Sequence, residues 1–80
     1  MEVKLKHPVK LATGQLLEKI TLRRATRGDI KRAQKAASDP VDQEDFLLAA
    51  LTGLTIEDLD ALDIADSRVL SDAFRAMVDS

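Results

Sequence analysis

The segment Leu22-Arg23-Arg24-Ala25-Thr26-Arg27-Gly28-Asp29 separates a stretch with strand periodicity from a stretch with helical periodicity. Thr26 is a good N-cap residue, and Asp29 three positions later gives the pattern of a capping box with aspartate in place of glutamate. We therefore expect strands to precede this segment and short helices to follow it. That order is typical of an α+β fold.

Before this segment, the residues that would face inward fall on every second position. They are Val3, Leu5, His7, Val9 and Leu11 in a first run, and Leu16, Ile20 and Leu22 in a second. A period of two predicts a strand with one buried face. Pro8 cannot donate to a strand ladder, so the first strand should be bulged or lie at an edge. With a turn over residues 12–15, we expect residues 1–24 to form a β-hairpin.

After this segment, capping signals and apolar spacing predict three to four short helices. A first helix should span residues 27–37. A second should have Asp39 as its N-cap, Pro40 as its first residue and Gly53 as its end. The segments Thr55-Ile56-Glu57-Asp58 and Asp63-Ile64-Ala65-Asp66 repeat the capping pattern and should begin two further helices. We expect residues 1–80 to form a single domain, with the hairpin in residues 1–24 and the helical part in residues 26–80.

The residue inventory argues against catalysis, metal binding and cofactors. The chain has no cysteine and one histidine, His7, so disulfides, thiolate chemistry and Cys-based zinc sites are excluded. Its C-terminal carboxylates lack the order of an EF-hand loop and mostly fall at helix starts. The segment Asp66-Ser67-Arg68 matches only part of the Asp-Ser-Leu motif of carrier proteins. We predict a protein that is not an enzyme, with no catalytic, cofactor-binding or metal-ligating residues.

Opposite charges collect in the two halves of the chain. Residues 1–37 contain ten Lys or Arg and three Asp or Glu, whereas residues 38–80 contain two and eleven. Such halves can fold on each other, stack head to tail with other copies, meet a charged partner, or simply form two solvated faces. The basic cluster around the first helix leaves a small DNA-binding transcriptional regulator as an alternative, although an acidic chain repels phosphate.

Two apolar helical stretches are candidates for binding another protein. One covers residues 46–54, and the other is the amphipathic stripe within residues 70–78. Both stretches can instead form the core, in which case the basic first helix or the hairpin edge would bind the partner. The predicted partner-binding residues are Phe46, Leu47, Leu51, Leu54, Leu70, Phe74, Met77, Val78, Arg24, Arg27 and Lys31.

The order of these signals resembles the tail assembly chaperones of Mu-like and related contractile-tailed phages. The matching motifs are residues 22–29 for L-R-x-x-T-x-G-D, residues 49–54 for A-A-L-T-G-L, and residues 55–62 for T-x-E-D/E-L-x-x-L. The resemblance implies a non-catalytic phage or prophage protein that binds the tape measure protein and helps to recruit the tail tube protein. It also implies that the protein is absent from the finished virion.

The expected location is the cytoplasm of the host bacterium. The N-terminus shows no signal peptide, and the longest apolar run, Phe46 to Leu51, is too short to cross a bilayer. We therefore expect no membrane contact and do not favour nucleic acid as a partner. A core of this size, built almost without aromatic residues, gives the fold little stability. Self-association into a homo-oligomer, which would add stability, is therefore a further expectation.

Overall fold

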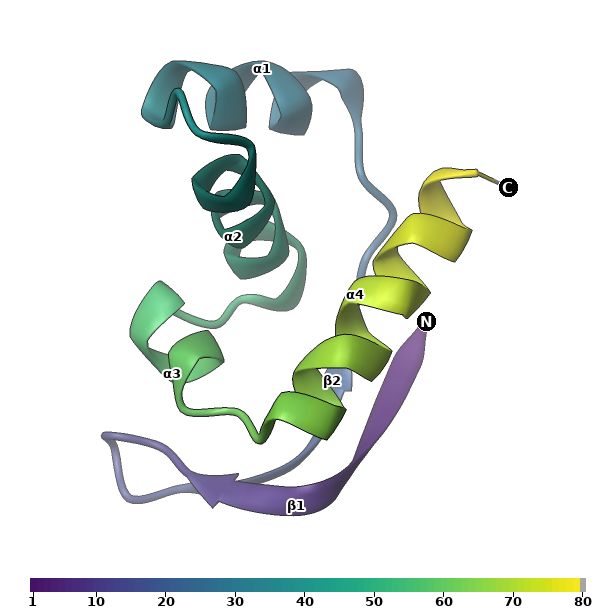
Figure 1. The fold of residues 1–80 in the computed structure, drawn as a ribbon. Coiled ribbons are helices and arrows are strands. Elements are labelled where there is room, and N and C mark those ends of the chain that lie inside the picture. The colour runs from purple at the N-terminus through teal and green to yellow at the C-terminus, as the bar shows by residue number, and fades with distance from the viewer. Residues whose placement is uncertain (80) are drawn as a thin grey trace.

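The computed structural model describes residues 1–79 and shows a two-stranded antiparallel hairpin followed by four helices (Figure 1). The strands are β1 (Glu2–Lys10) and β2 (Leu16–Thr21), and the helices are α1 (Arg27–Ala36), α2 (Pro40–Thr52), α3 (Ile56–Asp60) and α4 (Ile64–Val78). The α+β class and the order of hairpin before helices, both predicted from the sequence, are confirmed.

The helices form two groups that contact different strands of the hairpin. Helix α4 packs along β1, whereas α2 contacts β2 and carries α1 and α3 (Figure 1). The core forms where these groups meet on the inner face of the hairpin. Its buried apolar residues are Val3, Leu5, Ile20 and Leu22 from the hairpin and the segment after it, together with Leu48, Leu51, Leu59, Leu70 and Met77 from the helices. The described helices include none that is long and apolar enough to cross a membrane.

The helices begin and end where the sequence predicts. Thr26 and Asp29 form the expected capping box at the start of α1, and Thr55 and Asp58 form another at the start of α3. Asp39 caps α2, and Pro40 follows it as the first residue of the helix. The helix ends at Gly53, whose φ of 75° lies in the left-handed region. These local signals fix element boundaries because each satisfies N–H or C=O groups that a helix end leaves unpaired.

At the start of α4, the expected capping box is wrong. Asp63 caps the helix by accepting from the Ala65 N–H at 2.9 Å, as predicted. Asp66, however, turns away from the cap and accepts from the backbone N–H groups of Lys6 and His7, each at 2.9 Å. The carboxylate is almost fully buried. Asp66 therefore joins the first turn of α4 to the middle of β1.

The N–H groups that Asp66 accepts lie in a β-bulge. Lys4 pairs with Lys19 and Val9 pairs with Leu17, so four residues of β1 lie opposite one residue of β2. Pro8 falls within this interruption, which confirms the bulged alternative. Because the bulge changes which side chains face inward, the predicted inward positions of His7 and Leu16 are wrong. Both are exposed.

Candidate partner-binding site

An open apolar groove lies between the start of α1 and the C-terminal half of α4. It has a volume of about 290 Å³, and the apolar residues that line it are Ala25, Ile30, Leu47, Phe74 and Val78. We call this surface the α1–α4 groove. An adjoining hollow of about 270 Å³ shares Ala25, Ile30 and Val78 and extends to Arg24, Arg27 and Met77. The groove is therefore apolar inside and basic at one rim.

The α1–α4 groove leaves large apolar side chains in contact with water. Ile30 is 43% exposed and Val78 is 52% exposed. Phe74 is partly buried against the core, and Leu47 is half-buried from the α2 side. Contiguous apolar surface of this kind is where a soluble protein binds another chain. An open groove between helices is also the shape that receives an amphipathic helix.

The stripe of α4 serves both the core and the groove. Leu70 and Met77 are buried in the core, whereas Phe74 and Val78 turn toward the groove. Helix α2 divides in the same way, because Leu48 and Leu51 are buried while the adjacent Leu47 lines the groove. This division follows from helical geometry, since neighbouring residues are rotated onto different faces. Each of the two stretches is therefore divided between the core and the α1–α4 groove.

The structure brings together about half of the residues that we predicted to bind a partner. Leu47, Phe74, Val78, Met77, Arg24 and Arg27 line the α1–α4 groove or its adjoining hollow. The others lie elsewhere. Leu51 and Leu70 are core residues, and Leu54 is packed against the core. Phe46 lines a separate hollow beside Ile56, and Lys31 lies on the outer face of α1 with Gln34 and Lys35.

The segment that carries Arg24 and Ala25 to the groove is held by a buried carboxylate. Arg23 donates to both Asp29 oxygens, with Nη1 and Nη2 each 2.8 Å away, and Arg32 Nη2 donates from the other side at 2.8 Å. The Thr26 N–H also donates to Asp29, at 2.8 Å. The Arg23 hydrogen bonds, followed by the one from Thr26, hold the pKa of Asp29 well below its usual range. Asp29 thus fixes the link between β2 and α1.

Sequence reasoning found the capping role of Asp29 and missed its two arginine partners. Arg32 lies three residues after Asp29 on α1, a spacing that places the two side chains on one helix face. That spacing was therefore a usable signal. Arg23 precedes the helix, so no helical period could have paired it with Asp29. The same pairing engages Arg23 and Arg32, two cations of the basic cluster around the first helix.

Helices α2 and α4 are joined at their surface by one ion pair. Arg75 Nη2 lies 3.7 Å from Glu44 Oε1, and the Arg75 side chain is largely exposed. An exposed pair of this kind contributes little, on the order of 0–1 kcal/mol. The separation of α2 from α4 is therefore set by the core beneath the groove.

In the part of the chain that the structure describes, the buried polar groups are already paired and the groove has no metal site. Every buried side-chain nitrogen and oxygen in residues 1–79 already has a hydrogen-bond partner. Within the same residues, no group of three or more His, Cys, Asp or Glu side chains is placed to hold a metal ion. The charged residues that line the groove are Arg75 and Asp79, and Arg24 and Arg27 line the adjoining hollow.

We expect the free energy of unfolding to fall as the pH drops below about 4. Asp29 and Asp66 both have folded-state pKa values below their ordinary value, Asp66 chiefly because it accepts the Lys6 N–H. A lowered carboxyl pKa stabilises the fold fully above the unfolded pKa of about 3.9 and loses that contribution as the pH falls through the folded value. Urea midpoints from circular dichroism at pH 7, 4 and 2.5 would test this. Equal midpoints at pH 7 and pH 2.5 would contradict it.

Comparison with known proteins gives one result. A family model described as "Phage tail assembly chaperone proteins, E, or 41 or 14" matches residues 2–79. No curated protein and no solved structure matches the chain. The matched residues include the hairpin, all four helices and every residue that lines the α1–α4 groove.

Proposed function

We propose that this chain, which belongs to the phage tail assembly chaperone family, binds the tape measure protein through the α1–α4 groove and helps to recruit tail tube subunits. The family match confirms the resemblance seen in the motifs. The observation that carries the proposal is the apolar groove, in which Ile30 and Val78 remain exposed beside Leu47 and Phe74. We also propose that the protein acts without catalysis, in the host cytoplasm, and leaves before the virion is complete.

The groove suits a client that is helical and apolar along one side. Such a helix would place its apolar side chains against Leu47 and Phe74, with Ile30 and Val78 as the walls. The contact area is small, so most of its binding energy would be consumed by ordering the partners. A weak, reversible grip follows, which suits a chaperone that has to be displaced when the tube assembles.

The family match favours this proposal over a small DNA-binding regulator. Arg23 and Arg32, two members of the basic cluster, are engaged by the buried Asp29 carboxylate. The next helix, α2, has acidic residues in its first turns and is held against α1, α3 and β2. No helix of the helical part therefore combines a free basic face with the position of a recognition helix.

Co-expression with the tagged tape measure protein of the same phage would test the proposal. We expect the wild-type chain to raise the soluble fraction of the tape measure protein and to be recovered with it. Val78→Asp should lower the recovered complex at least roughly fivefold, because it places a charge on an apolar groove wall. Leu16→Asp is a matched control, since Leu16 is 55% exposed and Val78 is 52% exposed. Leu16 lies on β2, outside the groove.

The experiment has clear contrary outcomes. The proposal fails if the tape measure protein remains insoluble and no complex is recovered with the wild-type chain. The assignment to the α1–α4 groove fails if Leu16→Asp is as damaging as Val78→Asp while both variants unfold at the wild-type temperature. Recovery of the tail tube protein with the chaperone–client complex, and its loss without the chaperone, would test the recruiting role.

A further inference from the structure

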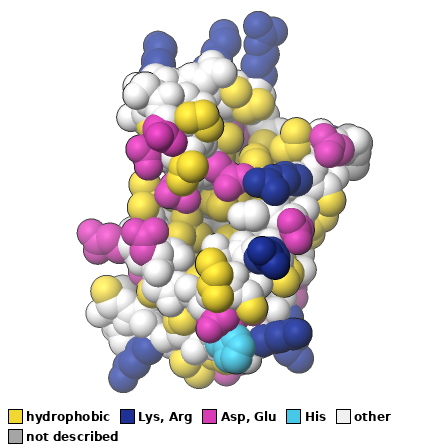
Figure 2. Space-filling view, viewed as in Figure 1, with side chains coloured by type: hydrophobic (Ala, Val, Ile, Leu, Met, Phe, Trp, Pro, Cys, Tyr) yellow, Lys and Arg dark blue, Asp and Glu magenta, His cyan; other side chains and the backbone are white. Residues whose placement is uncertain are grey.

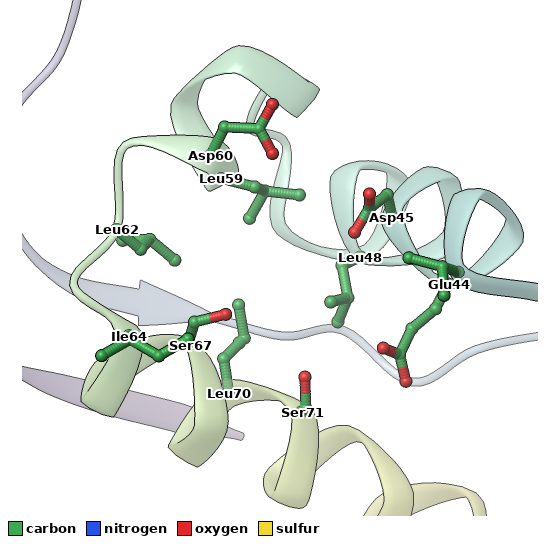
Figure 3. Close-up of a pocket in the computed structure, with 11 residues that line it drawn as sticks. Glu44, Asp45, Leu48, Leu59, Asp60, Leu62, Ile64, Ser67, Leu70 and Ser71 are labelled. Carbon is green, nitrogen blue, oxygen red and sulfur yellow. The ribbon is translucent and has the colours of Figure 1, made fainter.

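A second groove lies between α2, α3 and the first half of α4 (Figure 3). Its volume is about 350 Å³, and Leu48, Leu59 and Leu70 point into it from three helices and Leu62 from the segment between α3 and α4. Val41 and Ile64 also line it and are 68% and 84% exposed, so two large aliphatic side chains stand in water at its rim. On the surface, hydrophobic side chains fill the hollow in the middle of the face shown in Figure 2.

The remaining side chains give this groove a negative charge. Glu44, Asp45 and Asp60 line it, and it has no lysine or arginine among its lining residues. Glu44 faces Arg75 at 3.7 Å, whereas Asp45 and Asp60 have no ion pair within residues 1–79. Figure 2 shows acidic side chains beside the apolar hollow, with Lys or Arg side chains on its α4 side and others projecting from α1 at the top. We call this surface the acidic groove.

The carboxylates of the acidic groove repel one another. Burial raises the pKa of Asp45, and the neighbouring carboxylates of Asp60 and Asp42 raise it further. A raised carboxyl pKa means that the charged form is disfavoured in the folded state, so this group destabilises the fold as the pH rises above its ordinary value. A cation placed between Asp45 and Asp60 would relieve that repulsion.

We propose that the acidic groove binds an amphipathic helical segment whose apolar ridge is flanked by lysine or arginine side chains. The leucines supply a floor for the ridge, and Asp45 and Asp60 supply partners for the flanking cations. The inference rests on the proposed function in one respect, because it assigns this segment to the tape measure protein. The α1–α4 groove has the opposite charge at its rim, from Arg24 and Arg27.

A second copy of the chain fits the acidic groove less well. One basic surface that a copy could offer is the outer face of α1, with Lys31, Gln34 and Lys35. That face has no aliphatic ridge to fill a floor of leucines. Ile30, the large apolar side chain that α1 exposes, turns instead toward the α1–α4 groove. The outer face of α1 in a second copy therefore lacks the apolar ridge that the acidic groove would bind.

Two synthetic helical peptides with the same leucine ridge, one flanked by lysine and one by glutamate, would test this proposal by fluorescence anisotropy on the full chain. We expect the lysine peptide to bind about tenfold more tightly at low salt, with the preference shrinking as salt is added. The variant D45N/D60N should reduce the preference below about threefold. The variant E57Q/D72N changes net charge equally at exposed positions outside the groove, and it should keep the preference.

Several results would overturn the inference. Equal binding of the two peptides would do so, and so would an unchanged preference in D45N/D60N or an equal loss in E57Q/D72N. A dimer in sedimentation that D45N/D60N dissociates, with no peptide binding, would show that a second copy occupies the groove. D45N/D60N should unfold at or above the wild-type temperature, because it removes repulsion. The single variant Asp60→Asn on α3 gives the same comparison if the double variant does not fold.

The two proposals fail separately. Tape measure protein that is recovered with the chain, while the peptides show no charge preference, would refute only the inference about the acidic groove. A clear preference for the lysine peptide, with no recovery of the tape measure protein, would refute the proposed client and the assignment of the segment to it, but not the preference of the acidic groove for a basic amphipathic helix.

Discussion

Asp66→Ala should lower the melting temperature by roughly 10 °C or more, as expected when a buried group loses its whole hydrogen-bond set. The variant would leave the Lys6 and His7 N–H groups without an acceptor in the bulge of β1, where the hairpin ladder is already interrupted. It would also remove the polar link between the hairpin and α4. Thermal unfolding followed by circular dichroism at pH 7 measures the loss.

The matched control for this prediction is Asp72→Ala. Asp72 lies on the same helix and is exposed, so its removal should change the melting temperature by no more than a few degrees. Asp66→Asn should fall between the two, since an amide keeps one acceptor oxygen for one of the two N–H groups. If Asp66→Ala and Asp72→Ala had the same melting temperature, the Asp66 carboxylate would not stabilise the contact between α4 and the hairpin.

Asp29→Ala is expected to have the second large effect, with a loss of roughly 8 °C. The guanidinium groups of Arg23 and Arg32 are half-exposed or more and would return to water. The cost therefore comes from the unpaired Thr26 N–H, which is the Asp29 half of the capping box, and from a freed link between β2 and α1. That link lines the α1–α4 groove, so client binding should weaken as well.

Asp58→Ala isolates the capping part of this effect. Asp58 holds the equivalent position in the capping box of α3 but has no arginine partner. Its loss should cost no more than about half of what Asp29→Ala costs. Equal losses in the two variants would mean that Arg23 and Arg32 add nothing to the capping box. A stable Asp29→Ala protein that still binds the tape measure protein would contradict the second part of the prediction.

The sequence predicted the elements because each depends on neighbours in the chain. The capping pairs Thr26–Asp29 and Thr55–Asp58 act across three residues, and Gly53 ends α2 through its own backbone conformation. The inward positions of Val3 and Leu5 follow from strand alternation before the bulge. Signals of this range are contained in a short window of sequence, and these are confirmed, whereas the capping box expected at Asp63 and Asp66 is not.

The features that the sequence did not predict depend on partners far apart in the chain. The capping role predicted for Asp66 is wrong because its carboxylate accepts instead from the N–H groups of Lys6 and His7. Those N–H groups are unpaired in the hairpin ladder only once the bulge forms. The phase change past the bulge then exposed Leu16, against expectation. The α1–α4 groove likewise depends on how α4 lies relative to α1, and no periodicity within one helix specifies that relation.

The hydrogen bond from Lys6 to Asp66 joins residues 60 positions apart and has a consequence for synthesis on the ribosome. A hairpin of two strands is marginal in water by itself, and here its interrupted middle is completed by a residue near the far end of the chain. Closing so long a loop is slow and entropically costly. The nascent chain must therefore emerge past residue 66 before its first strand acquires a full set of backbone partners.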